Sequence, residues 1–137
     1  MPEVSWLAVL LCGVATLLIG GLWYSPLLFG RAWQRETGLS DDVLASGSMA
    51  TRFGLTFLLG LIAGAVFAMF IGTAMTVAQA TAAGAAAGIA WVAASFGINY
   101  LFERRSLKLW LINGGYHAVQ FTTFGAIIGA LQWTPVP

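Results

Sequence analysis

Residues 53–72 read FGLTFLLGLIAGAVFAMFIG, twenty consecutive residues without a charged side chain. A helix that crosses the hydrocarbon core of a bilayer needs about 20 such residues. Backbone N–H and C=O groups in lipid must be satisfied inside the segment, so a continuous apolar run of this length predicts an α-helix. The stretch therefore indicates a membrane-spanning helix, and it decides the fold class.

The rest of the chain has the same apolar character. Hydrophobic residues make up 59% of the sequence and charged residues 8%, whereas a soluble domain carries about 25% charged residues. Four windows are long and apolar enough to span, at about 4–22, 53–72, 81–101 and 109–132. We therefore predict an all-α, integral membrane four-helix bundle that forms one domain over residues 1–137.

Two connections carry helix-start signals. Ser40 precedes two acidic residues, Asp41 and Asp42, which is typical of a helix N-terminus. We expect an interfacial loop or short helix between the first two spans, near 32–37 or 41–46. Thr76 and Gln79 have the spacing of a capping box and predict the start of the third helix.

The basic residues predict the orientation in the membrane. All six Lys and Arg residues fall in the loops 23–52 and 102–108, which lie on one side if the chain crosses four times. The positive-inside rule then places both loops in the cytoplasm and both termini outside. The sequence therefore predicts a multi-pass protein of the cell (inner) membrane with lipid partners. A net charge of +1 gives no surface for nucleic acid.

Small residues recur at steps of four in three of the spans. Such motifs let two membrane helices approach closely. They do not tell whether the contacts lie within one chain or between chains, and we expect a homo-oligomer. The glycines concerned are Gly60, Gly64, Gly84, Gly88, Gly125 and Gly129.

Polar side chains in the last two spans form the candidate binding site. Placing polar side chains in a membrane interior costs free energy, so such residues tend to mark a functional site or a contact between helices. Pairing the two spans about Ser106 predicts that Asn99 faces Asn113 and that Ser95 faces His117. The candidate polar site comprises Ser95, Asn99, Asn113, Tyr116, His117 and Gln120.

Two interpretations of this polar stripe stay open. It either holds helices together by hydrogen bonds or lines a polar, cytoplasm-facing cavity between spans 3 and 4 that binds or passes a small solute or ion. The alternatives are a structural or partner-binding membrane subunit without a pore and, third, a membrane enzyme acting on a lipid-soluble substrate. We predict no catalytic residue, metal or cofactor, because the spans hold no second carboxylate for paired acid–base catalysis and the sequence has no Cys/His cluster.

Two motifs resemble a known family. Residues 21–33, GLWYSPLLFGRAW, close the first span, and residues 113–121 read NGGYHAVQF. The first is expected to stop the helix at its proline and anchor it at the interface, or else to gate a substrate. The residues of this interfacial motif are Trp23, Tyr24, Ser25, Pro26, Phe29, Gly30 and Trp33.

Together these motifs resemble the bacterial four-span membrane family catalogued as domain of unknown function 1761. The resemblance implies a fold and a membrane location and supplies no activity. The family pattern often has aspartate at the position of Asn113. This chain therefore lacks an acidic side chain near its histidine, which weakens any proton-relay role.

Overall fold

A computed structural model describes residues 3–134, and every regular element in that range is helical, as the sequence predicts. The rod α5–η1–α6 is continuous, and η1 is a π-helical segment within it. The elements are α1 (Trp6–Trp23), α2 (Gly30–Thr37), α3 (Asp41–Ala45), α4 (Met49–Ile71), α5 (Val77–Ala86), η1 (Ala87–Ala93), α6 (Ala94–Phe102) and α7 (Leu107–Gln132).

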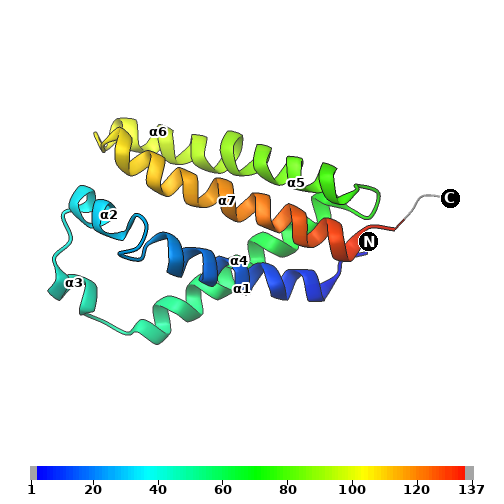
Figure 1. The fold of residues 1–137 in the computed structure, drawn as a ribbon, viewed down its shortest axis with the longest axis horizontal. Helices are drawn as coiled ribbons and strands as arrows, with labels where there is room; N and C mark the ends of the chain where they lie inside the picture. Colours follow the sequence, from blue (N-terminus) through cyan, green and yellow to red (C-terminus); the bar gives the residue numbers. More distant parts are fainter. Residues whose placement is uncertain (1–2, 135–137) are drawn as a thin grey trace.

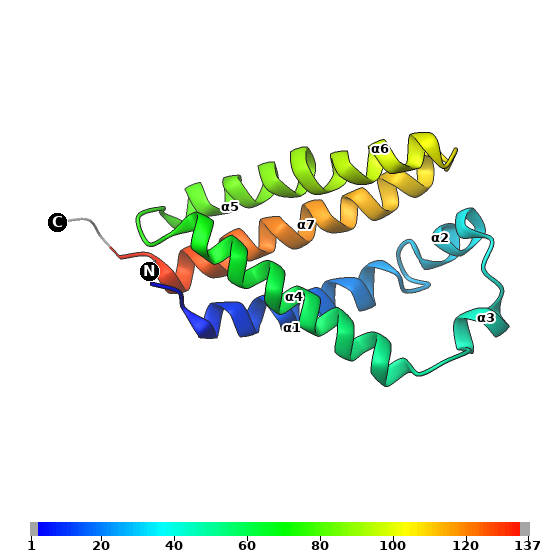
Figure 2. The same cartoon turned by 180° about the vertical axis from the view of Figure 1, so that it is seen from behind.

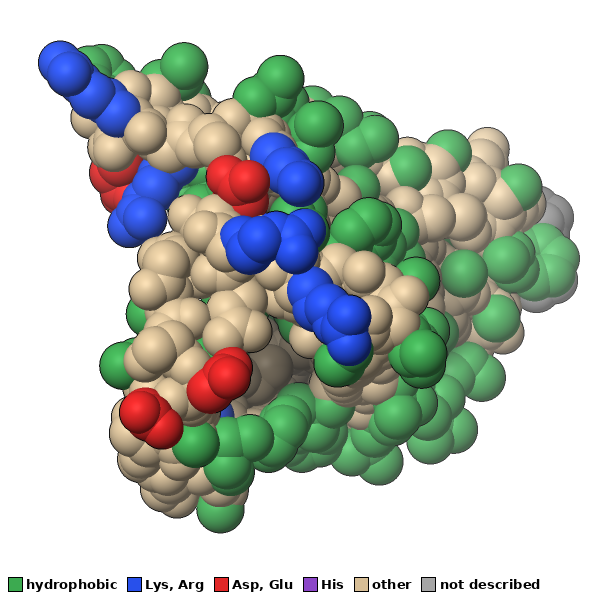
Figure 3. All heavy atoms as spheres, turned by 60° about the vertical axis from the view of Figure 1, so that its left-hand side comes forward, with side chains coloured by type: hydrophobic (Ala, Val, Ile, Leu, Met, Phe, Trp, Pro, Cys, Tyr) green, Lys and Arg blue, Asp and Glu red, His purple; other side chains and the backbone are tan. Residues whose placement is uncertain are grey.

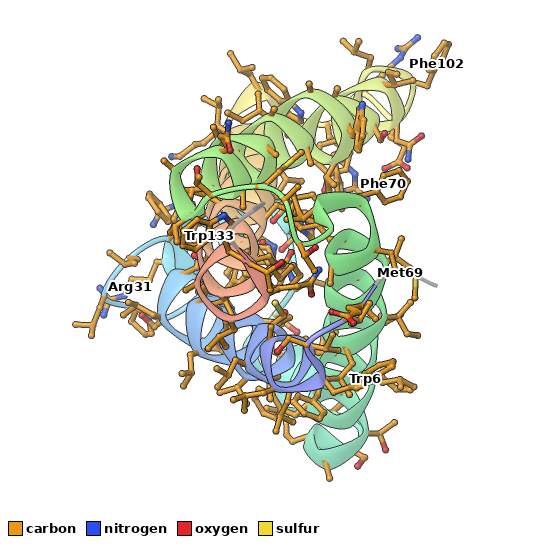
Figure 4. All side chains as sticks on the ribbon, turned by 90° about the vertical axis from the view of Figure 1, so that its right-hand side faces the viewer. Trp6, Arg31, Met69, Phe70, Phe102 and Trp133 are labelled. Atoms are coloured by element: carbon orange, nitrogen blue, oxygen red, sulfur yellow. The ribbon has the colours of Figure 1, made fainter. Side chains whose placement is uncertain are left out.

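Three helical rods are long and apolar enough to cross a membrane. They are α1, α4 and the continuous rod Val77–Phe102. Large apolar side chains on them are exposed, as lipid requires: Trp6 is 69%, Phe70 70% and Phe102 88% exposed, and Trp6 and Phe102 point away from the bundle in Figure 4. The 26-residue α7 is more polar, so the predicted fourth span stays a prediction.

The helix α7 lies between α1 and the rod α5–η1–α6, while α4 crosses α1 (Figures 1 and 2). Residues 3 and 134, the ends of the described part of the chain, lie at one end of the bundle. The opposite end, called here the loop end, holds α2, α3 and the turn between α6 and α7. Every charged side chain of the chain except Glu3 belongs to this end.

Glycines set the spacing between α5 and α7. A Cβ on Gly84 would lie 2.1 Å from the carbonyl oxygen of Phe121, and one on Gly125 would lie 2.1 Å from that of Ala80. The two backbones are therefore in direct contact, which only glycine permits. This part of the hairpin leaves no room for a ligand.

A second glycine pair sets the crossing of α1 and α4. Gly60 packs on Thr16, and Gly64 packs on Cys12. From this crossing toward the loop end, α4 diverges from α1, and residues 49–56 are exposed on all sides. The glycine motifs thus make contacts within one chain, and the predicted homo-oligomer remains a prediction.

The local start and stop signals have the predicted effect. Both α2 and α3 form where short interfacial helices were expected, and α2 ends at Gly38, whose φ is 70°. Only glycine adopts this left-handed conformation readily. The capping box of Thr76 and Gln79 begins α5. The proline motif ends α1 at Trp23.

The segment η1 changes which residues of the third rod face α7. A π-turn contains one residue more than an α-turn, so it rotates all later residues by about 100°. The indole Nε1 of Trp110 donates to the carbonyl oxygen of Ala93 over 2.7 Å at the end of this segment. Gly97 makes room for that indole, because its Cβ would lie 2.9 Å from Nε1.

Candidate functional site

A cavity of about 690 Å³ opens at the loop end between α1, α4 and α7. Figure 3 shows a hollow at this end, among the charged side chains. The polar walls come from Thr16, Tyr24, Asn113, Tyr116 and His117. The α2–α3 segment contributes Trp33 and Leu44, and α4 contributes Arg52 and Thr56.

The position of this cavity corrects the sequence prediction. The predicted site lay between spans 3 and 4, whose helices instead pack backbone to backbone at Gly84 and Gly125. The 690 Å³ cavity lies on the other side of α7, where α4 diverges from α1, while hollows of about 250 and 240 Å³ lie at the loop end of the third rod and α7. Of the third rod, only Phe96 reaches the cavity wall.

The two sequence motifs that carry the family resemblance meet at this site. The indole Nε1 of Trp23 donates to the carbonyl oxygen of Ile112 over 2.8 Å. The same indole covers Gly115, whose Cβ would lie 3.0 Å from the ring. Tyr24 Oη donates to Asn113 Oδ1 over 2.8 Å. The end of α1 is therefore fixed to the first half of α7 by two hydrogen bonds.

Asn113 joins three elements. Its Oδ1 accepts from Tyr24, and its Nδ2 donates to Tyr100 Oη over 2.7 Å. Burial raises the pKa of Tyr24, and the neighbouring Tyr116 and Tyr100 add to the rise, so the Tyr24 hydroxyl keeps its proton and can donate. The amide thus holds α1, α6 and α7 in one arrangement at the edge of the cavity.

A second polar chain lies deeper in the bundle. Thr16 Oγ1 donates to the carbonyl oxygen of Cys12 over 2.9 Å, and Gln120 Nε2 donates to Thr16 Oγ1 over 2.9 Å. Gln120 Oε1 lies 2.8 Å from His117 Nδ1. Tyr116 Oη donates to the carbonyl oxygen of Thr16 over 3.0 Å. These bonds connect the polar stripe of α7 to α1.

Aromatic rings surround the histidine. Phe96 stacks on the imidazole of His117, with ring centroids 5.1 Å apart and an angle of 22° between planes. Tyr116 meets the same imidazole edge to face at 4.8 Å. Tyr24 in turn contacts Tyr116 at 5.5 Å and Trp33 at 5.6 Å. The imidazole is therefore held in one orientation by rings on two helices.

Two of the predicted site residues lie elsewhere. Ser95 and Asn99 are exposed on the outer surface of the third rod, and Ser95 donates to the carbonyl oxygen of Trp91 in its own helix. The prediction that they face His117 and Asn113 is wrong. Phe96 and Tyr100, one residue further along, face His117 and Asn113 instead, because pairing about Ser106 fixes the level of a residue along the hairpin and not the side of the helix on which it lies.

The interfacial motif forms a compact turn after α1. Ser25 Oγ donates to the carbonyl oxygen of Leu22 over 2.7 Å, and a Cβ on Gly30 would lie 2.3 Å from the carbonyl oxygen of Tyr24. Phe29 packs on Trp23 with ring centroids 4.7 Å apart. Pro26 is exposed. The turn places α2 and its Trp33 over the cavity, so the motif does more than end the helix.

Sequence reasoning missed Thr16, Phe96, Tyr100 and Arg52. Thr16 had a usable signal, because it is the one hydroxyl or amide side chain inside α1. Phe96 and Tyr100 had none, since their direction depends on the π-helical segment. Within residues 3–134, no group of three or more His, Cys, Asp or Glu side chains could hold a metal ion.

The helices and this site define the class of the protein. Three rods of such length and apolarity, around buried polar side chains, are those of a small all-helical membrane protein. The chain belongs to the family described as "Protein of unknown function (DUF1761)", whose model matches residues 7–129. No curated protein and no solved structure compared with the chain matches it.

Proposed function

We propose that the chain is a four-span membrane protein that binds a small molecule in the cavity between α1, α4 and α7. The observation that carries this proposal is the cavity itself, about 690 Å³ in volume and floored by His117. Binding pockets for small molecules measure about 300–1,000 Å³ and combine apolar walls with few polar groups. This cavity has both properties.

The fourth span in this proposal is α7. Its 26 residues cover about 39 Å at 1.5 Å per residue, more than the hydrocarbon core of about 30 Å. Its polar side chains Asn113, Tyr116 and Gln120 are bonded to neighbouring helices, which removes the main cost of placing them in lipid. The low apolarity of α7 is therefore compatible with a span buried among the other three.

The cavity would open to the cytoplasm. All six basic residues belong to the loop end, which the positive-inside rule assigns to the cytoplasm of a cell (inner) membrane. His117 comes eleven residues after the N-cap Ser106, or about 16 Å along α7. A ligand at His117 would therefore lie near the middle of the bilayer, reached from the loop end.

Packing below the cavity favours binding over passage. Beyond Gln120, toward the terminal end, Phe124 and Ile128 are fully buried in the core. At that end Gln132 Nε2 donates to the carbonyl oxygen of Ala68 over 2.8 Å, and Gln132 Oε1 accepts from the backbone of Ser5 over 3.1 Å. These contacts close the bundle, so a solute would need a change of structure to cross.

Two helical glycines give a matched test. Gly21 lines the cavity and Gly54 does not, and a Cβ on either meets nothing within 4 Å. Purified protein in mild detergent is screened with small aromatic and aliphatic compounds by thermal shift, and hits are measured by calorimetry. Gly21→Phe should abolish binding by filling the cavity, while Gly54→Phe should leave it intact. Equal binding by both variants would place the ligand elsewhere.

A second candidate function, assembly with another copy of the chain, rests on the exposed half of α4. Phe53 is 50%, Leu55 55% and Leu59 65% exposed on this half. A homo-oligomer would cover it, whereas lipid would cover it in a monomer. Native mass measurement in mild detergent tests this directly, and Leu59→Trp should weaken any oligomer found. A monomer at all concentrations would leave lipid as the only partner of this surface.

A further inference from the structure

The hydrogen bonds around His117 fix the position of its proton. Thr16 Oγ1 gives its only hydrogen to the carbonyl oxygen of Cys12, so toward Gln120 it can only accept. Gln120 must therefore turn its Nε2 toward Thr16 and its Oε1 toward His117. An amide oxygen cannot donate, so Nδ1 of His117 carries the hydrogen.

The other ring nitrogen is consequently a free acceptor. A neutral imidazole has one N–H and one lone pair, so Nε2 of His117 presents the lone pair. Within residues 3–134, no side chain or backbone group bonds to Nε2, and it is not among the buried atoms left without a partner. Nε2 is therefore accessible, on a side chain that lines the cavity.

The charges around the cavity favour an uncharged ligand. Among the described residues, no Asp or Glu side chain lines the cavity, so a cation would find no counter-ion there. Arg52 lies at the loop end of the cavity, where it donates to the carbonyl oxygens of Leu44 and Ser46. Its charge repels cations, while the lone pair of His117 repels anions at the floor.

The walls favour a flat, apolar body. Phe53, Phe96, Tyr24, Trp33 and Tyr116 contribute aromatic rings to the lining. Aromatic side chains pack best against other rings, in offset or edge-to-face geometry. A ring-bearing molecule with one O–H or N–H group would pack against these rings and could still donate its hydrogen to His117.

We infer that the ligand is a neutral, ring-bearing molecule that donates an O–H or N–H to Nε2 of His117, as a phenol does. This inference rests on the proposed binding function and adds the chemical class of the ligand. Gln120 is then a positioning residue, because it selects the tautomer of His117 through Nδ1 and does not line the cavity.

The chain has one histidine, so ¹⁵N-histidine labelling gives a spectrum of His117 alone. NMR in detergent should show the Nδ1–H tautomer. Addition of 4-butylphenol should shift the Nε2 resonance, while its methyl ether, 4-butylanisole, should bind about tenfold or more weakly because it has no hydrogen to donate. A Gln120→Leu variant should lose the single tautomer and the preference for phenol, and Gln79→Leu, outside the cavity, should keep both.

The failures of the two proposals are distinguishable. An Nε2–H tautomer in the wild-type protein, or anisole binding as tightly as phenol, would overturn the assignment of the ligand class while leaving the cavity as a binding site. Binding of both probes that is unchanged by Gly21→Phe would overturn the proposed site. These wild-type measurements decide the matter even if Gln120→Leu does not fold.

Discussion

Tyr24, the residue after the end of α1, donates its hydroxyl to Oδ1 of Asn113 over 2.8 Å. The bond joins residues 89 positions apart in sequence, and Nδ2 of the same amide donates to Tyr100. Three helices thus meet at one side chain beside the cavity. Hydrogen bonds between membrane helices average about 0.6 kcal/mol and reach about 1.7 kcal/mol. This amide therefore holds the loop end of the bundle together by two modest bonds.

Removing the hydroxyl of Tyr24 tests this relationship. Tyr24→Phe keeps the ring contacts with Trp33 and Tyr116 and leaves Asn113 Oδ1 without its donor, so the free energy of unfolding should fall by about 1 kcal/mol. Unfolding in detergent measures the change. A double-mutant cycle with Asn113→Ala isolates the bond. A coupling energy of zero would show that the two residues act independently.

The glycine contacts between α5 and α7 predict a large difference between two similar substitutions. Gly84→Ala places a methyl group 2.1 Å from the carbonyl oxygen of Phe121, so the helices must separate. Overpacking of this kind costs about 1–3 kcal/mol. Gly54→Ala meets nothing within 4 Å and should gain up to about 1 kcal/mol from helix propensity. Thermal unfolding of both variants in one detergent gives the comparison, and equal stability would refute the close packing.

The proposed orientation, with the loop end in the cytoplasm, predicts which loops react with an impermeant reagent. Ala74→Cys lies in the exposed connection between α4 and α5, and Glu103→Cys lies in the exposed turn after α6. On intact cells a charged maleimide should label only Ala74→Cys, and Glu103→Cys should react after permeabilisation. Native Cys12 is fully buried and serves as the unreactive background. The reverse labelling pattern would invert the proposed topology.

Local signals in the sequence predict the helices well. The apolar runs, the capping box at Thr76 and the serine before Asp41 each act within a few residues, so helix type and helix starts follow from neighbours in the chain. The contact between the motifs at Tyr24 and Asn113 could not be predicted in this way. It depends on how two helices far apart in sequence cross, and no pattern within either motif encodes that crossing.

The error at Ser95 and Asn99 has a local cause of another kind. The prediction paired these residues with His117 and Asn113 about Ser106, which sets their level and not their direction. Counting from the contacts of Gly84 and Gly88 with α7 at α-helical spacing also leads to residues 95 and 99. The segment η1 adds one residue to this count, so Phe96 and Tyr100 take the inward positions. A π-turn has no distinctive composition here, since η1 reads AGIAWVA, so the sequence could not reveal the offset.

Deletion of one residue from η1 should therefore preserve the site. Removing Ala90, which is exposed, turns the π-turn into an α-turn and keeps Phe96 and Tyr100 directed at α7. Ala82 is also exposed but lies within α5, which has no inserted residue. Removing it shifts the residues before it by one position along the helix and displaces Ala80 from Gly125. Thermal unfolding should show near wild-type stability for the first deletion and a large loss for the second. The ¹⁵N signals of His117 should likewise stay unchanged only in the first, because its stacking on Phe96 is retained. If both deletions were equally damaging, the extra residue in η1 could not be what directs Phe96 and Tyr100 at α7.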